Sequence, residues 1–300
     1  MSCTRILCAF AAILAPLAIL AGCASFQPPQ YAGKITKVAE PIDLSPVVEG
    51  KFAFSETSLT TTSFEFKVFG DLMKMTGTGT VRTEASAHSS ITSAGTGYVM
   101  AIMFDRINAR PVDGKADSEG ERFEVEDLGY TGFLDGNGRV VALDVDVMSE
   151  GWLSMKSEHR QMVQEELDDW KKRRKREPVL PDIVATGDVI EVELDGRDLY
   201  PQGNEKLPKD FKVTGRVSYS IAGTTTFRDR RHLVLVMKGE IEGASKKERM
   251  NMSGEMGGFM LVDTANGDLA HWEQKVQVKV TIPKGKMSIR EETQGDLTRR

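Results

Sequence analysis

Cysteine and histidine have the widest chemical range in this chain, because thiolate and imidazole groups act as nucleophiles, bases and metal ligands. The chain of 300 residues has three cysteines and four histidines. No histidine belongs to a His-Glu-x-x-His motif or to a close pair, since they are scattered at His88, His159, His232 and His271. The sequence also has no Gly-x-Ser-x-Gly nucleophile turn and no Ser-x-x-Lys motif. We therefore predict a chain without a metal site, without a cofactor and without enzymatic activity.

The N-terminal segment has the build of a secretory signal. Arg5 precedes an apolar run from Ile6 to Gly22, which is interrupted by Pro16. A basic start followed by a short apolar core is typical of signal peptides. The run is short for a membrane-spanning helix, which needs about 20 apolar residues. We interpret residues 1–22 as a signal peptide.

The end of this run is Leu20-Ala21-Gly22-Cys23, which resembles the lipobox of bacterial lipoproteins. The resemblance implies transfer of a diacylglyceryl group to the sulfur of Cys23, cleavage before Cys23, and acylation of the new amine with a fatty acid such as palmitate. Cys3 and Cys8 would leave with the signal peptide, so no free thiol would remain. Ala24 follows the cysteine, which resembles the sorting signal for the outer membrane and implies a lipid-anchored body in the periplasm. The alternatives are an uncleaved anchor, or an ordinary signal peptide with a chance cysteine.

Residues 23–46 contain four of the eleven prolines of the chain. Proline-rich segments tend to be extended, at about 3.1 Å per residue. We predict a lipidated tether that holds the body away from the membrane. The alternative is an N-terminal arm packed on the body.

Alternation of apolar and polar residues dominates the rest of the chain. Such alternation predicts half-buried strands, as in residues 64–68, 141–147, 190–194 and 276–282. Two longer apolar runs, residues 98–104 and 233–237, predict central strands covered on both faces.

Two hairpin signals suggest an internal repeat. Residues 133–143 and 260–272 each place an Asp and then an Asn-Gly pair between two apolar strands. We predict a mainly β fold made of two similar curved antiparallel sheet halves, half-barrel or sandwich-like. The halves would span residues 47–148 and 179–283, and residues 284–300 would form a polar C-terminal tail.

Residues 149–178 predict an amphipathic helix between the halves. Its apolar residues recur at helical spacing: Trp152, Met155, Met162, Val163 and Trp170. This stripe either caps the open face of a sheet or forms a movable lid over an apolar ligand groove, a role that adaptable methionines suit. The helix ends in a basic run of Lys171, Lys172, Arg173, Arg174, Lys175 and Arg176. The run is either a solvated helix end or a contact for an anionic envelope polymer.

The second half resembles a widespread, functionally uncharacterised family of exported bacterial β-rich proteins. The resemblance depends on Gly187 and Asp188 before a strand, and on Asp263 and Gly267 in a hairpin. The aromatic residue that usually follows the Gly-Asp pair is missing, and Ile190 stands nearby instead. The family has no known catalytic residues. A curved sheet with a helix beside it is also similar to the half-barrel of lipid-binding lipoproteins, which is an analogy of fold alone.

These observations favour a binding protein of the cell envelope. The net charge of −5 argues against a nucleic-acid partner, which would require a basic face. We predict a non-catalytic envelope lipoprotein that binds a lipid or another apolar ligand and meets the membrane through Cys23. The alternative is a structural or assembly protein of the envelope that acts through protein–protein contacts. An apolar cavity beneath the helix would favour the first hypothesis, and a filled core with exposed strand edges would favour the second.

Overall fold

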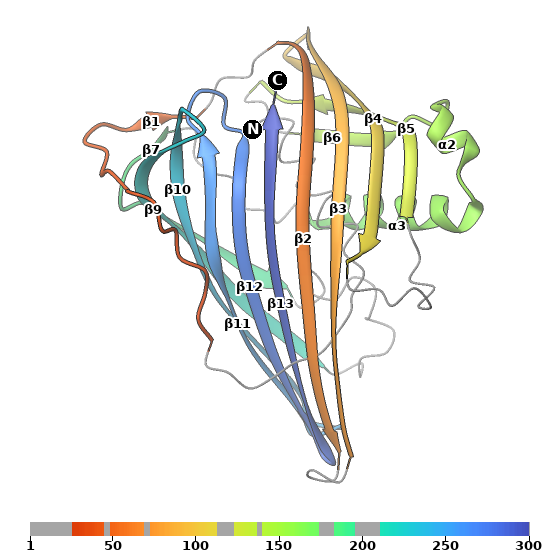
Figure 1. The fold of residues 1–300 in the computed structure, drawn as a ribbon, viewed down its shortest axis with the longest axis vertical. Coiled ribbons are helices and arrows are strands. Elements are labelled where there is room, and N and C mark those ends of the chain that lie inside the picture. Colours follow the sequence, from red (N-terminus) through yellow and green to blue (C-terminus); the bar gives the residue numbers. More distant parts are fainter. Residues whose placement is uncertain are drawn as a thin grey trace.

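The computed structural model describes residues 26–44, 49–68, 73–112, 123–136, 140–173, 183–195 and 211–299. These residues confirm the predicted mainly β fold, because most of them belong to one eleven-stranded antiparallel sheet. The sheet is strongly curved, wide at one end and narrow at the other (Figure 1). A small second sheet pairs β1 (Ile42–Asp43) with β7 (Ile183–Val184).

The strands of the large sheet form two groups, and within each group consecutive strands pair as antiparallel neighbours. The first five are β2 (Gly50–Val68), β3 (Met73–Ala94), β4 (Gly97–Pro111), β5 (Phe123–Leu134) and β6 (Val140–Val145). The other six are β8 (Val189–Asp195), β9 (Lys212–Phe227), β10 (Arg230–Ser245), β11 (Met250–Asp263), β12 (Leu269–Ile282) and β13 (Gly285–Arg299). Their spatial order is β6-β5-β4-β3-β2-β13-β12-β11-β10-β9-β8, so both groups belong to a single sheet.

The strand β13 joins the two groups, and it corrects the prediction of a polar C-terminal tail. Ile289 faces Val278 of β12 on one side and Phe64 of β2 on the other. The prediction was wrong because β13 carries Glu, Thr and Gly at inner positions where a typical half-buried strand carries apolar residues. Its place in the sheet depends on pairing with β2, more than 200 residues earlier in the chain.

The inner face of the curved sheet holds two apolar clusters. The first-half cluster is centred on β4, β5 and β6 and includes Phe104, Leu128, Tyr130 and Leu143. The second-half cluster lies on β8 to β12 and contains Val192, Val213, Val217, Met237, Ile241, Met252, Met256, Val278 and Val280. Apolar burial of this kind contributes about 25 cal/mol per Å² and is the main source of stability in such a sheet.

The predicted helix is present as two pieces, α2 (Glu150–Ser154) and α3 (Ser157–Arg173). The chain breaks the helix at Met155, whose ψ of 140° is extended. In space the helices do not lie between the halves, because α2 packs on β5 and α3 packs on β6, which is an edge strand of the sheet. Gly151 makes this packing possible, since a methyl group there would collide with the carbonyl of Glu126.

Residues 26–44 pack on the body, which corrects the prediction of an extended tether and supports the alternative of an arm. The ring of Tyr31 packs edge-on against Phe259, with 5.3 Å between ring centres. Thr36 forms an antiparallel bridge with Thr224, and Ile42 is buried beside Val184. The arm stays on the body because its few large apolar side chains find partners there.

The two long apolar runs behave differently. Leu233 and Val234 of β10 are both completely buried on opposite faces, as predicted for a central strand. The run in β4 was wrongly predicted to be covered on both faces, because Met100 is buried while Val99 is 43% exposed. The outer face of β10 is covered by the arm, through Tyr31.

Candidate ligand-binding site

A pocket of about 560 Å³ lies at the wide end of the sheet. The turn between β11 and β12 meets the beginnings of β2 and β10 and the end of β13 at this pocket. Its lining residues are Phe52, Arg230, Arg231, Asp263, Thr264, Ala265, Asn266 and Arg299. Three arginines line this pocket, and guanidinium groups match the geometry of carboxylate and phosphate ligands.

The turn between β11 and β12 is held by its own polar side chains. The Oδ1 atom of Asp263 accepts a hydrogen bond from the N–H of Ala265 at 2.8 Å. The Oδ1 atom of Asn266 accepts one from the N–H of Asp268 at 3.0 Å. Gly267 has a positive φ of 69°, which confirms the Asn-Gly turn predicted from the sequence. The turn is therefore a rigid support for its two carboxylates.

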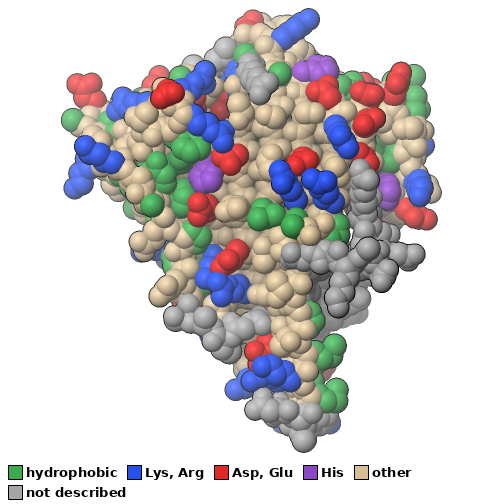
Figure 2. All heavy atoms as spheres, in the orientation of Figure 1, with side chains coloured by type: hydrophobic (Ala, Val, Ile, Leu, Met, Phe, Trp, Pro, Cys, Tyr) green, Lys and Arg blue, Asp and Glu red, His purple; other side chains and the backbone are tan. Residues whose placement is uncertain are grey.

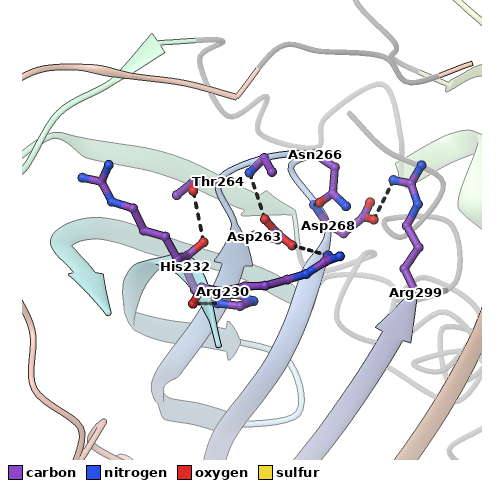
Figure 3. A network of polar contacts seen from close by, with 9 residues as sticks. Arg230, His232, Asp263, Thr264, Asn266, Asp268 and Arg299 are labelled. Carbon is purple, nitrogen blue, oxygen red and sulfur yellow. Dashed lines mark hydrogen bonds and ion pairs between the residues drawn. The ribbon is translucent and has the colours of Figure 1, made fainter. Parts of the chain in front are cut away.

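Both carboxylates of the turn are paired with arginines, as Figure 3 shows. Arg230 donates a hydrogen bond from Nη1 to Oδ2 of Asp263 at 3.0 Å, and Arg299 donates from Nη1 to Oδ2 of Asp268 at 2.8 Å. The two aspartates are buried, and the side chain of Arg299 is only 12% exposed. Because a buried charge needs a partner, these pairs fix the orientation of the two guanidinium groups.

Arg299 also connects the pocket with the apolar inner face. Its guanidinium carbon lies 3.6 Å from the ring centre of Phe52 and 5.9 Å from that of Phe54. Phe54 belongs to the first-half cluster and Phe52 packs against it. The cation stacks on the aromatic faces, a favourable arrangement for a guanidinium. One wall of the pocket is therefore apolar and continuous with the core.

The pocket is suited to an anion that carries an apolar part. Three guanidinium groups meet two carboxylates, so one positive charge is in excess. A guanidinium has five N–H donors in a planar fork, and a single bond to a carboxylate leaves donors for a second anion. Arg231 is exposed, and no carboxylate of the described residues pairs with it. Its Nε donates to Thr224 Oγ1 at 3.4 Å. Arg231 is thus the best placed of the three to meet a phosphate or carboxylate.

Two histidines that are distant in sequence come together beside this site, on the outer face. His232 and His271 each lie with their ring centres 5.6 Å from that of Phe227. His232 is buried, and burial lowers the pKa of its imidazole below the ordinary value. The Nδ1 atom of His271 lies 3.1 Å from a carboxylate oxygen of Asp296. The sequence showed scattered histidines because only the pairing of β10, β11 and β12 brings these two close.

The inner face between the two apolar clusters carries buried acidic side chains. Glu56 is 4% exposed, and its Oε1 atom has no hydrogen-bond partner. Burial raises the pKa of Glu56 to about 8 and also raises the pKa of Glu291. Thr60 and Thr293 lie between them, with their Oγ1 atoms 3.2 Å apart. The inner face is therefore not uniformly apolar.

The structure places part of the predicted helix stripe in the core. Met155 and Val163 are buried members of the first-half cluster, and Trp152 packs against it. Leu167, which is 1% exposed, completes this contact. The side chains of Met162 and Trp170 lie outside the described residues. In the described part the stripe caps a filled cluster, which counts against the predicted ligand groove beneath the helix. The described pocket is lined by strands and a turn, away from the helix.

The other predicted site residues are only partly described. Lys171 donates a hydrogen bond from Nζ to Oδ1 of Asp144 at 2.6 Å, which ties the helix end to β6. Lys172 and Arg173 belong to α3, but their side chains lie outside the described residues, as do Cys23 and all of residues 174–176. Of the residues that carry the family resemblance, Gly187 and Asp188 form the turn before β8, where Oδ2 of Asp188 accepts from the N–H of Ala185 at 2.7 Å.

Sequence reasoning identified the hairpin of the pocket but missed its arginines. Arg230 and Arg231 are the first two residues of β10. Basic residues at the start of a strand do not by themselves indicate a binding site. Arg299 is the second-last residue of the sequence, in the segment that was predicted to be a polar tail. Only the pairing of Arg299 with Phe54 across β13 and β2 brings it to the pocket.

The part of the chain that the structure describes contains neither a group of metal ligands nor a membrane-spanning helix. Within the ranges that the structure describes, no three His, Cys, Asp or Glu side chains are grouped as metal ligands would be. No helix in the same ranges is long and apolar enough to cross a membrane.

Comparison with known proteins adds little. No protein-family model and no curated protein matches the chain. The crystal structure of Pseudomonas aeruginosa OpdQ is similar to it with a TM-score of 0.26 and 7% identity, over 83% of this chain and 98% of that chain. DynF from the dynemicin biosynthesis pathway of Micromonospora chersina is similar with a TM-score of 0.16 and 9% identity, over 90% and 92% of the two chains. Similarities this low carry no inference about function.

Proposed function

We propose that the protein is a non-catalytic binding protein of the cell envelope whose ligand is an anionic amphiphile, such as a lipid with a phosphate headgroup. The charged group of the ligand would lie against Arg231 and the outer N–H donors of Arg230 and Arg299. The apolar part would lie against Phe52. The observation that carries this proposal is the ion-paired Arg299, which stacks on Phe52 inside a pocket of about 560 Å³.

The physical chemistry of the pocket supports a ligand of this class. Charge-assisted hydrogen bonds from guanidinium groups are shorter and stronger than neutral ones, and they favour planar or tetrahedral oxyanions. A volume of several hundred Å³ is typical of small-molecule sites. The fixed ion pairs hold two arginines in place before a ligand arrives, so less conformational entropy is lost on binding.

The charge of Arg231 gives a direct test of this ligand class. We expect Arg231→Gln to weaken binding of dodecyl phosphate by about 10-fold or more, because a hydrogen bond to a charged group contributes about 1.5–3 kcal/mol. Isothermal titration calorimetry measures this change. Arg231 is the suitable site because replacing Arg230 or Arg299 would leave a buried aspartate without its partner.

The matched control is Arg216→Gln. Arg216 is 65% exposed on β9 and makes only a 4.0 Å contact with Glu191, so this variant removes the same charge at a distance from the pocket. We expect its affinity to stay within about twofold of the wild type. Equal losses in the two variants would refute a specific site and leave only general charge attraction.

We also propose that the chain is anchored in the outer membrane by acyl chains on Cys23, with the body in the periplasm. The support is the sequence Leu20-Ala21-Gly22-Cys23. Two acyl chains suffice for stable anchoring, because each buried methylene contributes about 0.8 kcal/mol.

Replacing Cys23 by alanine is expected to abolish labelling of the protein with radioactive palmitate and to leave the signal peptide uncleaved. Labelling and electrophoretic mobility are compared with a Cys8→Ala variant, which removes a cysteine inside the signal segment and keeps the lipobox. Undiminished labelling of Cys23→Ala would exclude this anchor.

A further inference from the structure

The narrow end of the sheet has an unusual combination of exposed apolar and basic side chains. β2, β3, β10, β11, β12 and β13 all end or begin there, as their register shows and as the convergence of strands in Figure 1 illustrates. Figure 2 shows Lys and Arg side chains gathered at this end, with hydrophobic side chains at its edge. We call this region the narrow-end surface, and it belongs neither to the pocket nor to the anchor.

The apolar part of the narrow-end surface comes from β3. Met73 and Met75 are each 56% exposed and lie on the inner face, where Met75 is paired with Phe66 of β2. Among the described residues they have no strand paired on the other side, because the pairing of β3 with β4 begins only at Val81. Leaving two large apolar side chains this exposed at a strand end costs free energy unless another apolar medium covers them.

The basic part comes from the turns and strand ends around these methionines. The exposed cations are Lys74, Lys246, Lys247, Arg249, Lys284 and Lys286. Among the described residues, the acids nearby in register are Glu65, which pairs with Lys67 and Lys74, and Glu248. The whole chain has a net charge of −5, so this local excess of positive charge is opposite in sign to the rest of the protein.

We propose that the narrow-end surface docks onto an anionic lipid bilayer. Methionine side chains would enter the boundary between headgroups and acyl chains, and the surrounding lysines would contact lipid phosphates. Membrane surfaces with anionic lipids attract clusters of basic residues, and apolar side chains beside such a cluster add to the binding. Charge complementarity favours a bilayer over an apolar protein partner, because exposed basic side chains such as Lys246, Arg249 and Lys286 would be desolvated without compensation in an apolar protein interface.

A tryptophan placed in the surface reports the docking directly. In the full-length Met75→Trp variant, we expect vesicles of brominated phosphatidylglycerol to lower the added indole emission by about twofold, after subtraction of the wild-type signal. Brominated phosphatidylcholine vesicles should leave it unchanged, and 1 M salt, where the Debye length is about 3 Å, should restore it. The control is Val99→Trp, which lies opposite Thr92 near the other end of β3 and should not be quenched.

Charge reversal separates docking from anchoring. The triple change Lys74→Glu, Lys246→Glu and Lys286→Glu, made in the Met75→Trp background, should abolish the quenching. The same number of reversals outside the surface, Lys34→Glu, Lys37→Glu and Lys51→Glu, should leave it intact. Quenching of the indole at position 75 in neutral vesicles, quenching that survives the triple reversal, or no quenching at all would each overturn the proposal. The N-terminal segment is the same in all variants, and the arginine pocket is untouched, so failure here is distinct from failure of the proposed function.

Discussion

Replacing Glu56 by glutamine is expected to raise the free energy of unfolding at pH 7 by about 3 kcal/mol. The carboxyl group of Glu56 is 4% exposed and points into the inner face, between Ala85 of β3 and Leu297 of β13. Its Oε1 atom has no hydrogen-bond partner. An ionised carboxylate in this position has lost most of its water, and its Oε1 atom gains no hydrogen bond in return.

The direction of the pH dependence follows from the pKa. Burial raises the pKa of Glu56 from 4.5 to about 8. Between pH 4.5 and pH 8, the folded state therefore keeps a proton on Glu56 that the unfolded state has released. Stability is therefore unaffected by this group below about pH 4.5, falls as the pH rises towards 8, and changes no further above it. At pH 7 the pH exceeds the unfolded pKa of 4.5, and each unit of this difference lowers the free energy of unfolding by about 1.4 kcal/mol. Glutamine has no proton to release, so Glu56→Gln would remove this loss of stability.

Urea denaturation at pH 4, 7 and 9 measures this effect. The gain from Glu56→Gln should be absent at pH 4, about 3 kcal/mol at pH 7, and on the order of 5 kcal/mol at pH 9. Glu49→Gln is the control, because Glu49 is exposed just before the same strand and should change stability by less than about 0.5 kcal/mol. A Glu56→Gln gain that is the same at all three pH values would contradict a raised pKa.

Truncation of Leu167 to alanine is expected to lower the free energy of unfolding by about 2–5 kcal/mol. Leu167 is the most deeply buried of the described side chains of α3, at 1% exposure, and it belongs to the first-half cluster with Leu128, Tyr130 and Leu143. The substitution would leave a cavity between the helix and the sheet. The size of the loss therefore measures how firmly α3 is part of the core.

This experiment decides between the two hypotheses for the helix. A capping helix gives the full loss, whereas a movable lid over an empty groove would lose less than about 1 kcal/mol. Gln164→Ala is the control, because Gln164 is exposed on the same helix and its side chain donates a hydrogen bond to Asp168 on the same helix. We expect that control to change stability by about 0.5 kcal/mol or less.

The sequence by itself determined the local elements of this protein. Alternating apolar residues predicted β2, β6, β8 and β12, and the Asn-Gly turn before β12 has the positive φ that glycine permits. The spacing of Trp152, Met155 and Val163 predicted a helix, and Met155 and Val163 are buried in the first-half cluster. These features depend on interactions between residues that are close in the chain. Such local patterns can be read from a single sequence.

Only the tertiary structure decided how distant segments meet, and the candidate site depends on such meetings. β13 was not predicted because Glu291 and Thr293 occupy inner positions, yet it pairs with β2 along its whole length. That pairing brings Arg299 to Phe52 and Asp268, and it buries Glu56 opposite Leu297. The physical reason is that strand alternation specifies which face of a strand is buried but not which other strand lies beside it. The pairing of β13 with β2 supplies that choice, through contacts between residues that the chain separates by more than two hundred positions.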